Sequence, residues 1–267
     1  MKKTERQEQL LLEQLGRRHT LTLAEAKTLL GVSESTARRL FIRLESSGAA
    51  VRRYGGIQLL QESPAADYLY EQVEGQYAAQ KRQIGRCAAE MIESGDVLYL
   101  DSGTTMACLC TALSERLAAG EIGELSVFTN SLVNLDLLSP HTKVNLIGGE
   151  YRRNRRDFCG YLAEELVGGL HFTKCFLGAD GFHYRYGFTA TDFYTARLNE
   201  LALSNADRGI VVMDSSKFMA ASVVSYSRDR RIDTVLTDRE PPESLAQRLA
   251  DWGTQVVLCV PETPEES

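Results

Sequence analysis

Two short polar stretches in the second half of this sequence contain residue types suited to holding a phosphate group. The segment "DSGTT", residues 101–105, offers a glycine that lets the backbone approach an anion and two threonine hydroxyls that can donate hydrogen bonds. A helical pattern follows it, and a helix N-terminus presents free backbone N–H groups and a positive dipole end. The segment "DSSK", residues 214–217, adds the ammonium of Lys217. Together they predict a phosphate seat, although a threonine at a helix start, taken alone, is more often only an N-cap.

Three further turns follow apolar runs and extend the predicted site: "TNS" at 129–131, "GG" at 148–149 and "DG" at 180–181. In an open parallel sheet ligands bind at the carboxyl ends of the strands, so these turns are expected to converge. The arginine-rich run at 152–156 is interpreted as a solvated loop, of which Arg152 could help to hold an anion. The predicted effector-binding residues are Asp101, Ser102, Gly103, Thr104, Thr105, Asn130, Ser131, Gly148, Gly149, Arg152, Asp180, Gly181 and Lys217.

Near the N-terminus, two predicted helices have the spacing of a helix-turn-helix. The first covers about residues 23–30, where Thr22 and Glu25 can form a capping box at its start and Gly31 suits its C-terminus. The second covers about residues 33–47, with a serine as its N-cap. Two short helices joined by a tight turn with glycine are typical of DNA-binding proteins in which the second helix enters the major groove.

The second of these helices and the segment after it gather positive charge. Ala37, Phe41 and Leu44 form one apolar stripe, which leaves the serines and arginines on other parts of the helix surface. The following "AAVRRYGGIQLL" predicts two short strands around a glycine-rich turn, the form of a wing. Arginine can grip guanine or phosphate, whereas the alternative is a solvated hairpin on a small helical domain. The predicted DNA-binding residues are Thr22, Ser33, Ser35, Thr36, Arg38, Arg39, Arg43, Arg52, Arg53, Tyr54, Gly55 and Gly56.

Charge is unevenly distributed along the chain. Residues 1–60 contain 11 Lys and Arg against 6 Asp and Glu, which is a net charge of +5. Since the whole chain has a net charge of −6, the remaining residues carry −11. A basic head on an acidic body is the asymmetry expected of a nucleic-acid reader joined to another domain. No apolar run is long enough to span a membrane, and the N-terminus lacks the apolar core of a signal peptide. The six cysteines show no CxxC spacing, which indicates reduced thiols of a cytoplasmic protein without a metal site or cofactor.

The elements that must position these residues follow from hydrophobic periodicity. A first helix is expected over about residues 4–17, and residues 59–76 are interpreted as a linker with some helix. From residue 77 onward, apolar runs alternate with helical patterns, which favours a three-layer α/β domain with a mostly parallel sheet. The expected strands are "VLYL", "LSVF", "KVNLI", "KCFLGA", "GIVVM", "TVLT" and "QVVLC". The expected helices lie near 78–93, 104–118, 131–138, 161–169, 192–206 and 242–252.

The head and the body both resemble the DeoR/GlpR family of bacterial transcription regulators. The head matches the family pattern in "VSESTARRLFIRLESSG" and "RRYGG", and the body matches it in "GDVLYLDSGTT", "TNSL", "LIGGEYR", "FLGADG", "GFTA", "DSSKF" and "IDTVLTD". Leu40 departs from the pattern, because the family usually has an aspartate there, and Phe41 stands where it usually has leucine. The resemblance implies a winged helix-turn-helix domain over residues 1–58 and a sugar-phosphate-sensing and oligomerisation domain over residues 77–267, related in fold to ribose-5-phosphate isomerase.

The prediction for function is a repressor of a sugar-catabolic operon. It would bind double-stranded operator DNA as a homodimer or homotetramer and release it when a phosphorylated sugar or related metabolite binds the body. The alternative is a sugar-phosphate isomerase-like enzyme with a DNA-binding head, in which Asp180 and Lys217 would have catalytic roles. Turnover of sugar phosphates would discriminate between the two.

Overall fold

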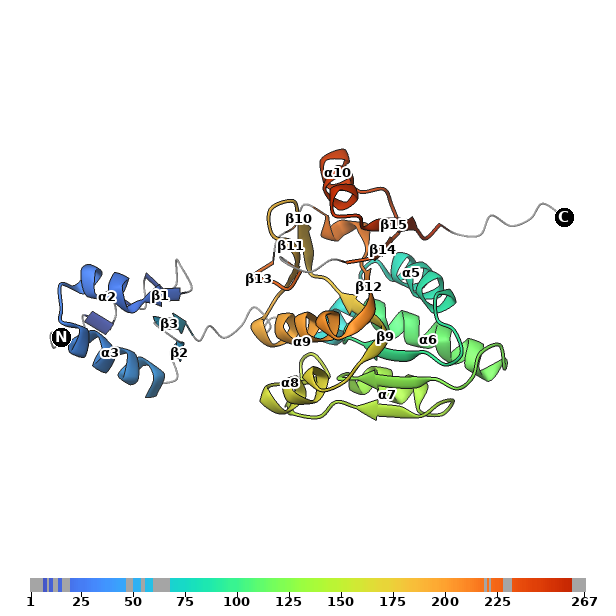
Figure 1. The fold of residues 1–267 in the computed structure, drawn as a ribbon, viewed down its shortest axis with the longest axis horizontal. Helices are drawn as coiled ribbons and strands as arrows, with labels where there is room; N and C mark the ends of the chain where they lie inside the picture. Colours follow the sequence, from blue (N-terminus) through green and yellow to red (C-terminus); the bar gives the residue numbers. More distant parts are fainter. Residues whose placement is uncertain are drawn as a thin grey trace. The chain divides into compact units, whose positions relative to one another are not determined.

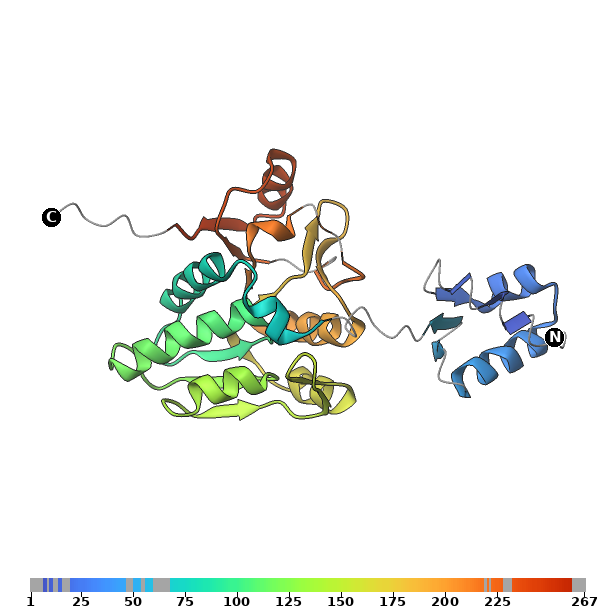
Figure 2. The same ribbon diagram turned by 180° about the vertical axis from the view of Figure 1, so that it is seen from behind.

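The computed structural model divides the chain into two compact units, Met1–Pro64 and Ala65–Ser267 (Figures 1 and 2). The residues that it describes are 7–8, 10–11, 14–15, 20–46, 50–53, 56–59, 68–218, 220, 222–227 and 232–260. Each unit has its own hydrophobic core.

The N-terminal unit combines helices with a small antiparallel sheet. Helix α2 covers Leu23–Leu30 and α3 covers Glu34–Ser46. The residues described between positions 7 and 15 are helical, as the sequence predicts. Three strands pair in the order β1-β3-β2, with β1 at Thr20–Thr22, β2 at Ala50–Arg53 and β3 at Gly56–Leu59. The predicted helix-turn-helix and the two strands of the wing are confirmed, and β1 is an additional strand.

The predicted ends of α2 and the predicted start of α3 are also confirmed, whereas the predicted ends of the first helix lie outside the described residues. Thr22 and Glu25 form the capping box of α2, and Gly31 ends that helix in the left-handed conformation at φ 61°. Ser33 accepts a hydrogen bond from the backbone N–H of Thr36, 3.4 Å away, at the start of α3. These side chains satisfy backbone groups that a helix end leaves without partners.

Two positions of the head have packing roles that the sequence did not indicate. Leu40, at the position where the family usually has aspartate, is 2% exposed and packs in the core with Phe41 and Leu44. A Cβ at Gly56 would lie 2.5 Å from the carbonyl oxygen of Leu21, so the close approach of β3 to β1 requires glycine. Gly56 therefore has a structural reason to be glycine that is independent of DNA.

The C-terminal unit is built on a seven-stranded parallel sheet in the order β15-β14-β12-β9-β4-β5-β6. Its strands are β4 (Val97–Leu100), β5 (Ser126–Thr129), β6 (Val144–Leu146), β9 (Phe172–Gly178), β12 (Ala206–Val212), β14 (Thr234–Thr237) and β15 (Gln255–Leu258). All seven were predicted from their apolar runs; β4, β9, β12 and β14 are mostly buried, whereas the edge strands β6 and β15 are partly exposed.

Helices cover both faces of this sheet and make the three predicted layers (Figure 1). Helices α5 (Ala78–Glu90), α6 (Thr104–Ala118) and α7 (Leu132–Leu138) share one core with the sheet. Helices α8 (Tyr161–Gly168), α9 (Phe193–Ser204) and α10 (Glu243–Asp251) share the other. The α/β prediction is confirmed.

Short antiparallel pieces that the sequence did not indicate complete the body. β7 (Glu150–Arg152) pairs with β8 (Asp157–Cys159), and β11 (Gly187–Ala190) pairs with β10 (Gly181–His183) and β13 (Val224–Ser225). They are two to four residues long, too short for a period-2 pattern to stand out from its surroundings.

The second half of the predicted linker lies on the body. Helix α4 covers Tyr70–Glu74, and the Tyr70 side chain is 2% exposed. The backbone N–H of Tyr70 donates to the carbonyl oxygen of Asn154 at 3.0 Å. Residues 68–76 are therefore part of the sensor unit, and residues 60–67 of the predicted linker lie outside the described part of the chain.

Candidate functional site

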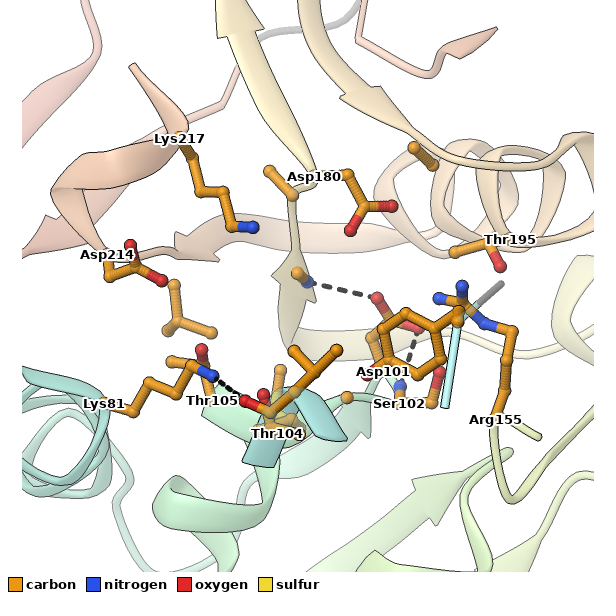
Figure 3. A pocket seen from close by; sticks show the side chains of 18 residues that line it. Lys81, Asp101, Ser102, Thr104, Thr105, Arg155, Asp180, Thr195, Asp214 and Lys217 are labelled. Carbon is orange, nitrogen blue, oxygen red and sulfur yellow. Dashed lines mark hydrogen bonds between the residues drawn. The ribbon is translucent and has the colours of Figure 1, made fainter. Parts of the chain in front are cut away.

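A cavity opens at the carboxyl ends of β4, β9 and β12, where the predicted turns meet (Figure 3). The segment 101–105 follows β4, Asp180 follows β9, and the segment 214–217 follows β12. Residues from α4, α5, β7–β8 and α9 complete its wall. Its polar lining consists of Lys81, Asp101, Ser102, Thr104, Thr105, Arg155, Asp180, Thr195, Asp214 and Lys217.

The loop before α6 has the geometry that an anion requires. Gly103 is the N-cap residue at φ 115° and ψ 170°, a conformation that residues with a Cβ rarely adopt. Thr104 and Thr105 form the first turn of α6, and no side chain caps it. The free backbone N–H groups of this turn and the positive end of the helix dipole lie beside the cavity.

Two lysines and one aspartate lie on the same side of the cavity as this helix end (Figure 3). Lys217 ends the short 3-10 turn Ser215–Lys217, and among the described residues its ammonium has no hydrogen bond or ion pair. Lys81 lies on α5 and is 3% exposed, and its ammonium donates to the carbonyl oxygen of Val73 at 2.7 Å. Burial lowers the pKa of Lys81, while nearby Asp214 counteracts part of this effect. The two ammonium groups supply donors and positive charge for an anion, whereas the Asp214 carboxylate accepts a hydrogen bond from the backbone N–H of Ser216.

The opposite side of the cavity is formed by Arg155 and polar side chains (Figure 3). Arg155 is 7% exposed, and its guanidinium lies 4.4 Å from the ring centre of Tyr68. Its Nε lies 3.5 Å from a carboxylate oxygen of Asp157 and its Nη1 lies 3.7 Å from one of Asp192, both beyond hydrogen-bonding geometry. Both contacts are ion pairs without hydrogen-bonding geometry, so Nε and Nη1 can still donate hydrogen bonds to a ligand.

Asp101 is a buried carboxylate at the centre of the site. Its two oxygens accept hydrogen bonds from the backbone N–H groups of Ser102, at 2.7 Å, and Gly178, at 3.1 Å. Burial raises the pKa of Asp101 to about 6, although these hydrogen bonds and nearby Arg155 favour the charged form.

We expect the Asp101 carboxyl to titrate near pH 6 in the folded protein. The folded-state pKa lies above the unfolded value of about 3.9. The contribution of this carboxyl to stability is therefore fully present below pH ~3.9 and is lost as the pH rises through about 6. A carbon-13 NMR titration of labelled aspartate carboxyls, assigned with Asp101→Asn, measures this value. An Asp101 resonance that titrates near the ordinary aspartate value would contradict it.

Arg152 serves a different purpose from the predicted anion contact. Its guanidinium donates to both carboxylate oxygens of Asp157, at 2.8 and 2.7 Å, to Asp192 at 2.8 Å and to Thr195 at 3.0 Å. The Ser102 hydroxyl also donates a hydrogen bond to Asp157, at 2.8 Å. Arg152 does not line the cavity, and its neighbour Arg155 does. Arg152 therefore holds the hairpin, α9 and the 101–105 loop together.

The remaining predicted effector residues surround the site without lining the cavity. The Asn130 side chain donates to the Phe158 carbonyl, and the Ser131 hydroxyl caps α7. Gly149 and Gly181 lie against backbone carbonyls that leave no room for a Cβ, and Gly148 has open space around it. The structure brings Asp101–Thr105, Asp180 and Lys217 together, and it adds Tyr68, Lys81, Arg155, Thr195 and Asp214.

The predicted DNA-binding residues of α3 are mostly exposed. Arg38 forms an ion pair with Glu34 at 2.8 Å, and Arg43 forms one with Glu8 at 2.7 Å. Arg39 is exposed and has no ion pair or hydrogen bond among the described residues. The Ser33 hydroxyl forms hydrogen bonds with those of Ser35 and Thr36, and Thr22 is engaged in its capping box.

The predicted DNA-binding residues of the wing are described only in part. Arg52 and Arg53 lie on β2, where only their backbone is described, and Tyr54 and Gly55 lie outside the described residues.

The described part of the chain has neither a cluster of metal-ligating side chains nor a membrane-spanning helix. No group of three or more histidine, cysteine, aspartate and glutamate side chains there could hold a metal ion. No helix there is long and apolar enough to cross a membrane. All six cysteines are free thiols.

Two family descriptions match the chain. Residues 6–63 match the DeoR-like helix-turn-helix domain, and residues 76–239 match the DeoR C terminal sensor domain. The protein is thus a helix-turn-helix transcriptional regulator with a sensor domain, and it belongs to the DeoR family.

Similar proteins are named as repressors, and one of them is named for lactose. A provisionally named aga operon transcriptional repressor of Escherichia coli O157:H7 is 30% identical over 258 residues, covering 96% of this chain and 93% of that one. The lactose phosphotransferase system repressor of Streptococcus mutans serotype c is 27% identical, covering 96% and 100%. The repressor GlcR of Bacillus subtilis strain 168 is 28% identical, covering 93% of both.

Solved structures match part of this chain at low TM-scores. The ribose 5-phosphate isomerase A of Methanocaldococcus jannaschii has a TM-score of 0.39 at 17% identity, covering 52% of this chain and 53% of that chain. The translation initiation factor eIF-2B of Pyrococcus horikoshii OT3 has a TM-score of 0.35 at 16% identity, covering 76% and 56%. The chain therefore spans only about half the length of these structures.

Proposed function

We propose that this regulator represses a sugar-utilisation operon and leaves its operator when a phosphorylated sugar or a related metabolite binds the sensor cavity. The observation that carries the proposal is the juxtaposition of Lys81, Lys217 and the uncapped start of α6 in one cavity. This side of the cavity suits a phosphate. The opposite side, with Asp101, Asp180 and Arg155, offers acceptors and a donor for sugar hydroxyls. A relative named as a lactose phosphotransferase system repressor supports a sugar-utilisation operon as the target.

A thermal-shift screen of the full chain against pentose and hexose monophosphates tests the proposal. A ligand at 100 times its dissociation constant should stabilise the protein by ~2.7 kcal/mol. The matching unphosphorylated sugars and inorganic phosphate are the controls, and both should give smaller shifts than the effector. The proposal would be wrong if no phosphorylated sugar in the screen raised the melting temperature.

An isomerase-like enzyme is the rival proposal, and we favour a regulator without catalytic activity. The Asp180 carboxylate, which a catalytic role would require, accepts hydrogen bonds from the Thr191 backbone N–H at 2.7 Å and the Thr191 hydroxyl at 2.5 Å. Both bonds occupy acceptor positions of the carboxylate, so Asp180 is already engaged within the protein. Isomerisation of a sugar phosphate that is lost in Asp180→Ala would reverse this choice.

The exposed Arg39 guanidinium is proposed to contact DNA. We expect Arg39→Ala to weaken operator binding and, if Arg39 reads a base, to reduce discrimination at one base pair by ~1–3 kcal/mol. Loss of affinity on all sequences with a shallower salt dependence would instead indicate a phosphate contact. Fluorescence anisotropy with operator variants measures both quantities. Arg153→Ala, an exposed arginine of the sensor unit, is the matched control.

We propose that the protein acts as a homodimer or homotetramer in the bacterial cytoplasm, where its operator lies. Helix-turn-helix heads are generally paired on half-sites about one helical turn, ~34–36 Å, or a multiple apart. Exposed apolar side chains on the neighbouring helices α8 and α9, which include Leu162 at 65% and Phe193 at 42%, suit contact with a second copy. Sedimentation of the full chain and of Leu162→Glu tests this surface, because a variant that associates like the wild type would exclude it.

A further inference from the structure

The segment Tyr68–Glu74, here called the strap, forms one wall of the sensor cavity. Tyr68 and Val73 line the cavity, and α4, which lies within the strap, contacts α6. The strap immediately follows residues 60–67, through which the chain continues from the helix-turn-helix unit. A change in the conformation of the strap is thus a change in the segment of chain that continues toward the DNA-binding head.

The first contact between the strap and a charged cavity residue is the bond from Lys81 to Val73. The Lys81 ammonium is buried, and its one hydrogen-bond acceptor among the described residues is the Val73 carbonyl oxygen, at 2.7 Å. An ammonium has three donors, so two remain for a ligand. A charged phosphate oxygen is a stronger acceptor than a peptide carbonyl and would compete with Val73 for this group.

The second contact is the stacking of Tyr68 on Arg155. The guanidinium lies 4.4 Å from the ring centre, and two of its buried nitrogens lack hydrogen bonds. A ligand hydroxyl or anionic oxygen that satisfies these donors would draw the guanidinium toward itself and away from the ring. The two contacts come from opposite sides of the cavity, and both end on the strap.

We propose that the strap is the element that reports the state of the cavity, with Lys81 and Arg155 as the ligand-binding cations that hold it when the cavity is empty. A phosphorylated ligand takes over both cations, the strap loses its two charged anchors, and its hydrogen bonds to the body weaken. The bond between the Tyr70 N–H and the Asn154 carbonyl is the reporter, because it joins the strap to the loop that carries Arg155. This inference rests on the proposed effector class.

Hydrogen–deuterium exchange of the full chain tests the inference. The probe is the sugar monophosphate that gives the largest thermal shift, with its unphosphorylated sugar as the control. With the probe bound, the amides of residues 101–105 should exchange more slowly. Those of residues 70–74 should exchange faster by at least about fivefold, the lower range of a typical allosteric coupling. Slower exchange at 101–105 with unchanged or slower exchange at 70–74 overturns the strap mechanism and leaves the proposed function intact. A screen without any shift removes the proposed function itself.

A pair of lysine variants provides the second measurement. Lys81→Met removes the anchor of Val73, so its strap amides should exchange about fivefold faster than those of the wild type without any probe. The probe should then add little further change. Lys143→Met, at an exposed lysine outside the cavity, should behave like the wild type. Wild-type strap exchange in Lys81→Met would show that this contact does not hold the strap.

Discussion

Lys217→Met is expected to produce a repressor that binds its operator but is not released at the effector concentration that releases the wild type. The Lys217 ammonium faces the cavity without a partner among the described residues, so its loss leaves no buried acceptor behind (Figure 3). A hydrogen bond between charged groups contributes ~1.5–3 kcal/mol. The effector concentration for half-release should therefore rise roughly ten- to a hundredfold.

The measurement is operator release against effector concentration, with Lys143→Met as the matched control. Operator affinity without effector should be retained in both variants, because Lys217 lies outside the helix-turn-helix unit. A release curve that overlays the wild-type curve would exclude Lys217 from the phosphate seat. Loss of operator binding in folded Lys217→Met would show that sensing and DNA binding are not separable.

Arg152→Leu is expected to destabilise the sensor unit by ~3–5 kcal/mol, the usual cost of removing one partner of a buried ion pair. The variant leaves the fully buried Asp157 and the almost fully buried Asp192 without their principal cation. It also frees the Asp157 carboxylate that accepts from Ser102, so the 101–105 loop loses support. Denaturant unfolding of the full chain measures the change.

The destabilisation should depend on pH with a definite sign. Burial would raise the pKa of Asp192, but Arg152, Arg155 and hydrogen bonds from Thr195 hold it below its usual value. The stability that this carboxylate contributes is present above the unfolded pKa of about 3.9 and is lost as the pH falls through the lower folded pKa. The deficit of Arg152→Leu should thus be largest near neutral pH and shrink below pH ~4.

Arg153→Leu is the control for this prediction, because Arg153 is exposed on the same hairpin. It should change the free energy of unfolding by less than ~0.5 kcal/mol. The Arg152→Leu variant could instead be as stable as Arg153→Leu and respond poorly to the effector. That result would favour the role in anion binding that the sequence suggested for Arg152.

The sequence by itself determined the helix-turn-helix, the seven parallel strands and the turns that follow those strands. The capping box of α2, the glycine that ends it, and the seven strands of the sheet follow from local patterns, because caps and apolar periodicity depend on neighbouring residues. Helix α6 begins at Thr104 and ends at Ala118, as its sequence indicates. Since parallel strands end at one edge of a sheet, the order of elements also placed Asp101–Thr105, Asp180 and Lys217 in one cavity.

Only the tertiary structure decided which polar side chains face that cavity. Arg152 and Asp157 are direct partners across the β7–β8 hairpin, so Arg152 is held in an ion-pair network while Arg155, in the connecting turn, lines the cavity. Lys81 and Tyr68 reach the cavity from segments without a recognisable motif. Their contribution depends on how α5 and the strap pack against α6. A local pattern records the period of a helix or strand, but the direction of a side chain at a site depends on packing between residues far apart in the chain.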